Sequence, residues 1–292
     1  MTMIEPARPS AAPALLADAA VRSLRAEAQL SPKPGLVDRR GGGAHDDMDL
    51  PLMLASAQAL RPTFAQIAQA AGRTPAGVAL REKLGVLGRR GEQAMVRATG
   101  GINTHRGALW ALGLLVAAVA GGAADERAAA RAAARLAALP DRRVPAGEPS
   151  HGEQARRRHG AGGAREEAEN AFPHVTEVAL PRLRQGRAAG LGEETARLDA
   201  LLAVMSLLDD TCVLHRGGPD GLRAVRLGAR RVLTEGGAGT ASGRAALMEL
   251  DDALRERRLS PGGSGDLLAA ALFLDTVPWP ERCEQEVPAC RR

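Results

Sequence analysis

The feature that most constrains this chain is an apolar pattern with the period of an α-helix. Its clearest stretch is a leucine and methionine series that recurs every three or four residues and so lies on one helix face. The members of this series are Leu198, Leu201, Leu202, Met205 and Leu208. No segment alternates apolar and polar residues over a long run of β-branched or aromatic types, which is the pattern of a half-buried strand. The sequence therefore predicts an all-α fold.

Further segments with helical patterning occur along most of the chain. They span residues 50–60, 62–71, 76–87, 103–120, 125–139, 221–233, 243–258 and 266–274. We expect them to form one compact multi-helix bundle over residues 13–276, because no repeat of fixed period or shift in composition divides the chain. Residues 1–12 are expected to form a disordered arm and residues 277–292 a tail. The Pro-containing run at about 140–150 is expected to be a flexible surface loop.

Aromatic side chains are nearly absent, with three Phe, two Trp and no Tyr among 292 residues. This scarcity excludes nucleic-acid modules that stack bases on aromatic platforms. The formal net charge is +5, but the arginines are scattered through alanine-rich segments instead of gathered in a basic tail. We therefore expect no nucleic-acid partner.

A membrane or extracellular location is not expected either. The most apolar stretch, residues 108–120, is shorter than the roughly 20 residues that cross a bilayer, so we interpret it as a buried core helix. Cys212, Cys283 and Cys290 are odd in number and form no C-x-x-C pair, which argues against a disulfide framework and a structural zinc site. With no secretory signal at the N-terminus, these features predict a cytoplasmic protein.

The first of five segments dense in glycine and charge reads SPKPGLVDRRGGGAHDDMD, at residues 31–49. Lys33 lies between two prolines, which restrict its backbone and would direct its charge at a fixed point such as a phosphate. Asp46 and Asp49 are three residues apart and could share a Mg²⁺ through oxygen ligands. The alternative is that these acids only cap the helix that enters Pro51, worth ~1 kcal/mol.

The second segment, TGGINTHRG at residues 99–107, places two glycines before Asn103 and Thr104 at a helix start. Unpaired backbone N–H groups at such a start can bind an anion. His105 and Arg106 add side-chain donors to them. An ordinary Asn or Thr cap after a turn is the alternative interpretation.

The strongest purely physical signal is DDTCVLHRGG, at residues 209–218, which closes the periodic helix. Asp209 and Asp210 would then lie at the end of a buried helix, where the helix dipole disfavours negative charge. Burial there is costly unless a cation or metal pairs with the carboxylates, and Arg216 is a natural partner. A position that breaks local rules in this way points to function.

Two other segments have ordinary interpretations when taken alone. GAGGAREEAENAFP, at residues 160–173, has a charge density typical of a solvated helix face. LSPGGSGDLL, at residues 259–268, reads as a helix end and a turn, with Asp266 capping the next helix.

Taken together and in this order, the five segments resemble the triphosphoribosyl-dephospho-CoA synthase family from about residue 30 to residue 274. Runs such as ATGGINTHRGALWALGLL and DDTCVLHRGG are longer than chance would supply, and their combination is specific. The segments PLMLASAQALRPTFAQ, SHG and DDTCVLHRGG are most similar to the branch associated with malonate decarboxylase. The family is all-α and cytoplasmic, so the resemblance agrees with the periodicity.

The resemblance implies a transferase that joins ATP and 3′-dephospho-CoA. The 2′-hydroxyl of dephospho-CoA would replace adenine on C1 of the ATP ribose, and the triphosphate would stay attached. The product would be the precursor of the prosthetic group of the malonate decarboxylase acyl carrier protein. A carrier-protein transferase and that acyl carrier subunit are therefore implied partners.

The resemblance also implies roles for residues of these segments. Glycosyl transfer requires a carboxylate at the hydroxyl or the cationic carbon, an acid for adenine, and cations with Mg²⁺ for the triphosphate. The implied catalytic residues are Asp210 as base or metal ligand, Glu167 as a second carboxylate, and His105 or His45 as the acid. The implied phosphate-binding residues are Lys33, Gly100, Gly101, Asn103, Thr104, Arg106, Arg165 and Arg216. The implied Mg²⁺ ligands are Asp46, Asp49, Asp209 and Asp210.

The chain departs from the family pattern in the third segment, where His159, Glu166 and Ala171 replace a common Tyr, Gly and Gly. If position 166 requires a positive φ, glutamate there strains the backbone by about 1 kcal/mol or more. We therefore expect this segment to be the part of the site most altered in this chain.

Two other functions stay open. One is a non-catalytic module that binds the carrier protein through an arginine-rich surface, and it would release no adenine. The other is a Mg²⁺-dependent hydrolase of N-glycosidic bonds, which would form free ribose triphosphate whether or not dephospho-CoA is present.

Overall fold

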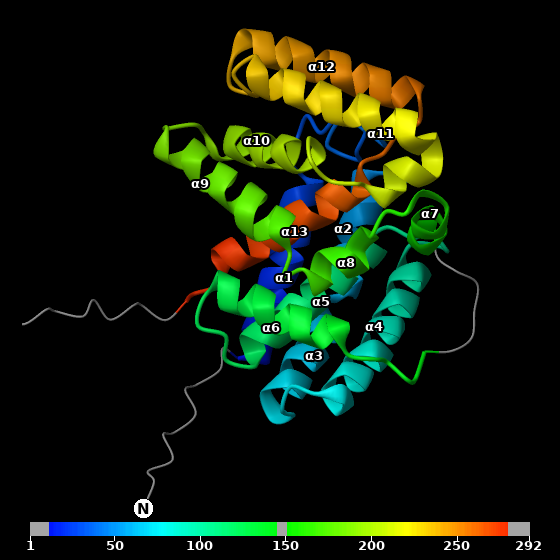
Figure 1. Cartoon of the computed structure of the whole chain (residues 1–292), viewed down its shortest axis with the longest axis vertical. Coiled ribbons are helices and arrows are strands. Elements are labelled where there is room, and N and C mark those ends of the chain that lie inside the picture. The colour runs from blue at the N-terminus through cyan, green and yellow to red at the C-terminus, as the bar shows by residue number, and fades with distance from the viewer. Residues whose placement is uncertain (1–11, 145–150, 280–292) are drawn as a thin grey trace, which may run out of the picture.

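The computed structural model describes residues 12–144 and 151–279 (Figure 1). Their elements are α1 (Pro13–Ala28), α2 (Leu50–Ala59), α3 (Arg61–Arg73), α4 (Val78–Ala98), α5 (Arg106–Ala120), α6 (Glu126–Ala138), α7 (His151–His159), α8 (Gly163–Glu169), the π-helical turn η1 (His174–Ala179), α9 (Leu180–Ala188), α10 (Glu193–Met205), α11 (Thr211–Thr234), α12 (Ala241–Glu256) and α13 (Gly262–Thr276). These residues form no strand, only an isolated bridge between Asp38 and Gly41. The predicted all-α fold is confirmed.

Helix α13 lies in the middle of the bundle and contacts α1, α5 and α10 (Figure 1). Its residues Leu267, Ala270 and Phe273 belong to a hydrophobic cluster built with α1 and α3–α6. Leu268 and Leu272, one turn apart on another face, belong to a second cluster built with α9–α12. One helix, α13, therefore packs against both hydrophobic clusters and joins the two halves of the core.

Helix α5 confirms the interpretation of the most apolar stretch as a core helix. From Ala108 to Ala120 its residues are buried, with Trp110 partly exposed. In the part of the chain that the structure describes, no helix is long and apolar enough to cross a membrane.

Helix α4 continues to Ala98, beyond the predicted end at residue 87. Gly91, beyond the predicted end, is a packing position, because a Cβ there would lie 2.7 Å from Cγ2 of Thr63 in α3. The close approach of α3 outweighs the ~1 kcal/mol that glycine costs inside a helix.

The predicted boundary around residue 210 is wrong. The periodic helix α10 ends at Met205, and Asp210 is the N-cap of α11, which begins at Thr211. Helix α11 is kinked where Gly218, with φ +58°, precedes Pro219. The sequence suggested one helix followed by a loop, whereas the structure has two successive helices, α10 and α11, joined by a short link.

The prediction of backbone strain at position 166 is also wrong, because Glu166 lies within α8. The strain falls instead at Ala171, which has φ +62° where the family commonly has glycine, and at Phe172, with φ +54°. An L-residue in this left-handed region costs roughly 1–2 kcal/mol. The arm at residues 1–11, the stretch 145–150 of the predicted loop and residues 280–292 of the predicted tail lie outside the described residues.

Candidate active site

The loop between α1 and α2 buries Lys33. Lys33 is 1% exposed, and its Nζ donates to Oε1 of Glu27, in α1, at 2.5 Å. Its backbone N–H donates to Oδ2 of Asp38 at 2.9 Å. A buried ammonium needs such a partner, because an unpaired charge in the interior is strongly destabilising. The structure therefore directs the charge of Lys33 into the protein, contrary to the expectation that it faces a phosphate.

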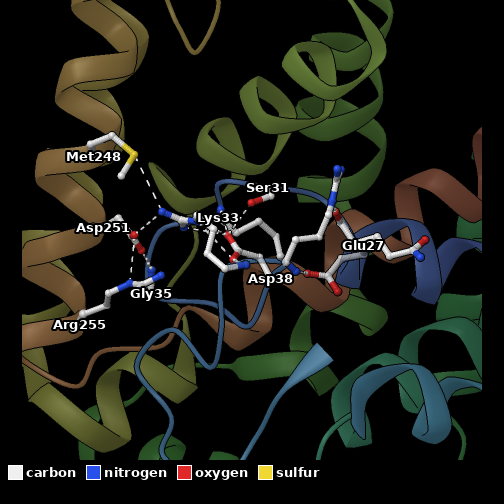
Figure 2. Close-up of polar contacts among 11 residues, drawn as sticks. Glu27, Ser31, Lys33, Gly35, Asp38, Met248, Asp251 and Arg255 are labelled. Carbon is white, nitrogen blue, oxygen red and sulfur yellow. Dashed lines mark hydrogen bonds and ion pairs between the residues drawn. The ribbon is translucent and has the colours of Figure 1, made fainter. Parts of the chain in front are cut away.

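Two carboxylates, which we call the Asp38–Asp251 cluster, fasten this loop to α12 (Figure 2). Asp38 accepts from Nη2 of Arg40 at 2.8 Å, and Asp251 accepts from Nη1 of Arg40 at 2.8 Å and from the N–H of Gly35 at 2.9 Å. Arg255 lies 3.0 Å from Asp251. Burial alone would raise the pKa of Asp38, but hydrogen bonds from Arg40 and the Lys33 N–H lower it below its usual value. Each acid here has a guanidinium, so the cluster is charge-balanced.

Asp210 holds the first turns of α11 and α13 together. Its Oδ1 accepts from the N–H of Cys212 at 3.0 Å, and its Oδ2 accepts from the N–H of Ser264 at 2.9 Å and the Ser264 hydroxyl at 3.0 Å. Asp210 is 2% exposed. Burial raises its pKa, although the bonds from Ser264 oppose the shift. At a helix N-terminus a carboxylate is favourable, so the predicted conflict with the helix dipole is absent.

Asp266, in the second turn of α13, is a carboxylate of a different kind. The N–H of Ala108 donates to it, and a Cβ on Gly107 would lie 2.0 Å from its Oδ2, so α5 begins directly against this side chain. Burial, followed by the nearby charges of Glu27 and Asp210, raises the pKa of Asp266 well above its usual value. As a whole residue, Asp266 is partly exposed. We call Glu27, Asp210 and Asp266 the acidic recess.

The predicted anion-binding turn borders this recess on the α5 side. Gly100 and Gly101 have φ values of +64° and +102°, and they are exposed together with Asn103. The hydroxyl of Thr104 lies 2.5 Å from that of Ser56 in α2. Helix α5 therefore starts from a turn that leaves backbone atoms accessible, as the anion-site interpretation requires.

His105 lies behind the same turn and is 2% exposed. Its Nδ1 is 2.7 Å from the Ser56 hydroxyl, while its Nε2 has no hydrogen-bond partner among the described residues. Burial and the charge of Lys33 lower the pKa of His105 to about 3. The imidazole is therefore neutral near pH 7 and carries no proton ready for transfer as an acid.

His45 and Arg216 form the opposite rim. Nε2 of His45 is 2.9 Å from the Ser260 hydroxyl, and its Nδ1 is 3.2 Å from a guanidinium nitrogen of Arg216. Burial and the charge of Arg216 lower the pKa of His45. Arg216 is exposed and contacts His45 and the Arg258 carbonyl, not Asp209 or Asp210 as predicted.

The remaining predicted side chains are held by local partners. Glu167 accepts from the N–H of His174 at 3.0 Å and lies 2.7 Å from its ring, so it ties α8 to η1. Arg106 pairs with Glu92 at 2.7 Å, and Arg165 pairs with Glu169 at 2.7 Å. Both arginines are largely exposed and can exchange these carboxylates for phosphates.

The four predicted Mg²⁺ ligands do not gather. Asp46 pairs with Arg258 at 3.0 Å, Asp49 caps α2 by accepting from the Leu52 N–H at 2.8 Å, and Asp209 pairs with Arg226 at 2.9 Å. Within residues 12–144 and 151–279 no three His, Cys, Asp or Glu side chains are placed to hold a metal ion. The residues that the structure describes therefore do not fit a Mg²⁺ site built by the protein alone.

The five segments nonetheless meet around the first turns of α13. Asp210 bonds Ser264, a Cβ on Gly107 would lie 2.0 Å from Oδ2 of Asp266, and a Cβ on Gly265 would lie 3.6 Å from Leu36. The third segment joins through the fourth, since a Cβ on Gly163 would lie 3.1 Å from Thr211. Sequence reasoning missed Glu27, Ser56 and Ser264 entirely and took Asp266 for a cap. The signal was weak: Ser264 and Asp266 lie in the glycine-rich LSPGGSGDLL run, but Glu27 lies in a helix that was not singled out.

Comparisons with known proteins give consistent results. Residues 13–284 match the family model described as ATP:dephospho-CoA triphosphoribosyl transferase. A relative from Azotobacter vinelandii, named probable 2-(5''-triphosphoribosyl)-3'-dephosphocoenzyme-A synthase, is 57% identical over 266 residues, covering 89% of this chain and 90% of its own. A Klebsiella pneumoniae protein named 2-(5''-triphosphoribosyl)-3'-dephosphocoenzyme-A synthase is 55% identical over 264 residues, or 90% of this chain and 94% of its own.

A solved structure shares the fold. The crystal structure of a putative triphosphoribosyl-dephospho-CoA synthase from Archaeoglobus fulgidus aligns with a TM-score of 0.54 and 18% sequence identity. The alignment covers 78% of this chain and all of the archaeal one.

Proposed function

This chain belongs to the ATP:dephospho-CoA triphosphoribosyl transferase family, and from that premise we propose that it makes 2′-(5″-triphosphoribosyl)-3′-dephospho-CoA from ATP and 3′-dephospho-CoA with release of adenine. The bond from C1 of the ATP ribose to adenine breaks, and its electron pair leaves with the base, which takes up a proton. The 2′-hydroxyl oxygen of dephospho-CoA forms the new bond to C1 and gives up its proton. The protons balance, so one carboxyl group can serve both transfers.

The observation that carries this proposal is the environment of Asp266. Its carboxyl group lies beside Glu27 and Asp210 with one backbone donor, in a residue that is partly exposed as a whole, and its raised pKa favours the protonated form. A general acid is most effective when its pKa approaches the working pH. Asp266 is therefore suited to protonate adenine as it leaves and to take the hydroxyl proton afterwards.

Neither predicted histidine is suited to that role. Burial keeps His105 neutral, and its accessible surface is only 2%. His45 has a lowered pKa beside Arg216, so it is also largely neutral at pH 7. We assign His45 to the rim of the site, where it positions Arg216.

Asp210 and Glu27 act as positioning residues in this proposal. Both oxygens of Asp210 accept hydrogen bonds from N–H and hydroxyl donors, which hold the carboxylate in place between α11 and α13. Glu27 is held by Lys33. Their negative charges raise the pKa of Asp266 and stabilise positive charge at C1 in an oxocarbenium-like transition state.

The phosphates are proposed to lie on the rim, away from these carboxylates. Arg106, Arg165 and Arg216 are exposed guanidiniums, and the turn from Gly100 to Thr104 leaves backbone atoms accessible. Guanidinium groups hold phosphates through paired, charge-assisted hydrogen bonds. Any Mg²⁺ is proposed to enter with ATP, bound mainly by phosphate oxygens, as Mg²⁺ usually is at nucleotide sites.

We further propose that the product supplies the prosthetic group of malonate decarboxylase, through a carrier-protein transferase and the acyl carrier subunit. The support is in the sequence: PLMLASAQALRPTFAQ and DDTCVLHRGG are similar to the branch associated with that enzyme.

The experiment is to incubate the protein with ATP, Mg²⁺ and dephospho-CoA and to measure adenine by chromatography and the coupled product by mass spectrometry. Dephospho-CoA is omitted in the control. Adenine with coupled product, formed only in the complete mixture, supports the proposal. Free ribose triphosphate in the control identifies a hydrolase instead. No adenine, together with tight binding of the acyl carrier subunit, identifies a carrier-binding module.

A further inference from the structure

Three arginines gather beside an indole ring on the outer side of α5. Arg81 and Arg89 are two turns apart on α4, and the guanidinium carbon of Arg81 lies 5.2 Å from the ring centroid of Trp110. Arg165, in the first turns of α8, is near enough for its charge to lower the pKa of Arg81. We call Arg81, Arg89, Arg165 and Trp110 the arginine cluster.

This cluster carries more positive charge than its carboxylates neutralise. Arg89 donates to Oδ2 of Asp141 at 2.8 Å, and Arg81 stands 3.6 Å from the same oxygen. Arg165 is 64% exposed and, among the described residues, forms an i,i+4 pair with Glu169. Burial, then the charges of Arg165 and Arg89, lower the pKa of Arg81 although Asp141 opposes them. One carboxylate therefore serves two guanidiniums while a third lies close by.

Arg81 is also incompletely satisfied. Its side chain is 10% exposed, and its Nε is buried with no hydrogen-bond partner among the described residues. The hydrogen bond from Arg89 to Asp141 already connects α4 to the chain that follows α6, so Arg81 is not needed for that connection. A buried guanidinium with a free donor costs free energy, so its presence favours a role in binding an anion.

The arginine cluster and the acidic recess adjoin the same turn of α8. Nε1 of Trp110 donates to the Ala164 carbonyl at 3.1 Å. The preceding residue, Gly163, faces α11, since a Cβ there would lie 3.1 Å from Cγ2 of Thr211, next to Asp210. On α5, Trp110 lies within the same helical turn as Ala108, whose N–H bonds Asp266, but on a different side of the helix. The two regions are therefore linked through α8 and through one turn of α5.

We propose that Arg81, Arg89 and Arg165 bind the polyphosphate chain of one of the two substrates, with Trp110 as the positioning residue that holds Arg81. The inference rests on the proposed function, because that reaction brings a triphosphate and a diphosphate to one centre. The carboxylates of the acidic recess repel phosphates, and Lys33 is engaged by Glu27. The charge that a polyphosphate needs is therefore supplied beside the recess, by these arginines.

The test uses the full chain with Arg89→Gln and Arg165→Gln combined, because both side chains are more exposed than Arg81 and their loss leaves the core intact. Arg97→Gln, at an exposed position of the same helix α4, is the matched control. Inorganic tripolyphosphate is titrated calorimetrically into each protein. We expect the dissociation constant to rise about tenfold or more per arginine in the double variant and not in the control.

Steady-state kinetics distinguish the two sources of polyphosphate. A KM increase of at least tenfold for ATP alone, with kcat changed less than about threefold, assigns the cluster to the triphosphate. The same increase for dephospho-CoA alone assigns it to the diphosphate. Tripolyphosphate affinity and both KM values equal to those of the Arg97→Gln control would overturn the proposal.

A spectroscopic measurement isolates Trp110 as reporter. In a Trp279→Phe background Trp110 is the remaining tryptophan of the chain, and tripolyphosphate should change its fluorescence because the ion rearranges Arg81 against the ring. An unchanged spectrum at saturating tripolyphosphate would contradict the inference. If the native protein releases no adenine, the proposed function fails, but the titration and the fluorescence still decide whether the cluster binds polyphosphate.

Discussion

The Asp38–Asp251 cluster and the acidic recess lie on either side of Lys33. They differ in whether their buried carboxylates are paired with cations. In the first, Arg40 bridges both acids and Arg255 adds a second cation beside Asp251 (Figure 2). Burial would raise the pKa of Asp38, but hydrogen bonds from Arg40 and the Lys33 N–H lower it. In the second, Lys33 pairs with Glu27, while Asp210 and Asp266 have only backbone and hydroxyl donors and their pKa values rise.

This difference suggests that the Asp38–Asp251 cluster serves stability and the acidic recess serves function. Balanced charges fix a loop, because each carboxylate gains a hydrogen-bonded guanidinium that compensates part of its desolvation. Unbalanced carboxylates cost stability, and a chain retains them where the excess charge serves chemistry. Removing a charge should therefore have opposite consequences in the two regions.

The largest effect is expected for Asp266→Asn. The amide keeps the size of the side chain but cannot transfer the proton, so kcat for adenine release should fall by about 10²–10⁴. Stability above the unfolded pKa should be equal or higher, because the folded variant no longer has to bind a proton at this position. Adenine release and urea unfolding measure the two effects on the same preparation.

Asp220→Asn, at an exposed position of α11, serves as the control for that substitution. It should change neither quantity. Full adenine release by Asp266→Asn would mean that another group donates the proton, and that the acidic recess does not differ from the Asp38–Asp251 cluster in function.

A loss of stability is expected for Asp251→Asn. The substitution leaves Arg40 and Arg255 facing a neutral amide in a site where Asp251 is 1% exposed, at a cost of about 2–3 kcal/mol in the free energy of unfolding. The urea midpoint should fall, and kcat of the folded protein should stay within about threefold. The neighbouring Asp252→Asn, which is exposed, is the matched control. An unchanged midpoint would mean that the cluster does not stabilise the fold.

The two regions should also differ in the pH dependence of stability. Asp38 has a lowered folded pKa, so its contribution is present above its unfolded pKa and is lost as pH falls through the folded value. Asp266 has a raised folded pKa, so the folded state binds its proton more tightly and stability declines as pH rises from the unfolded pKa through the folded one. Urea midpoints measured from pH 3 to pH 8 should show that decline, and it should be smaller in Asp266→Asn, in which Asp210 with its raised pKa still contributes. The same decline in the variant would mean that another group causes it.

Much of the fold could be predicted because its helices carry local signals. The apolar run at 108–120 and the period from Leu198 to Met205 correspond to α5 and α10. The ends were harder to predict, since α4 continues past the predicted end at residue 87 to Ala98, where Gly91 allows α3 to approach closely. Asp210 was singled out for a conflict with the helix dipole that the structure does not show, because its position as the N-cap of α11 depends on where α10 stops.

The recess could not be derived in the same way, because its chemistry comes from residues far apart in the chain. Asp266 looks like a helix cap when only its neighbours are considered. Its raised pKa depends on Glu27 in α1 and on Asp210 before α11. Burial of Lys33 likewise depends on Glu27, which no motif indicates. The family resemblance located the segments, but the structure was needed to show which of their charges are balanced.

The smallest expected effect provides a reference that involves no charge. Ala171→Gly relieves the positive φ of 62° at a position close to neither carboxylate cluster by sequence, between α8 and η1. Relief of left-handed strain, less the extra entropy that glycine gains in the unfolded chain, should stabilise the protein by about 0.5–1 kcal/mol. Because no titratable group changes, the gain should be the same at pH 5 and pH 8, as measured by the urea midpoint. A gain that depends on pH would show that the segment is coupled to the carboxylates, and the two regions could then not be treated as independent.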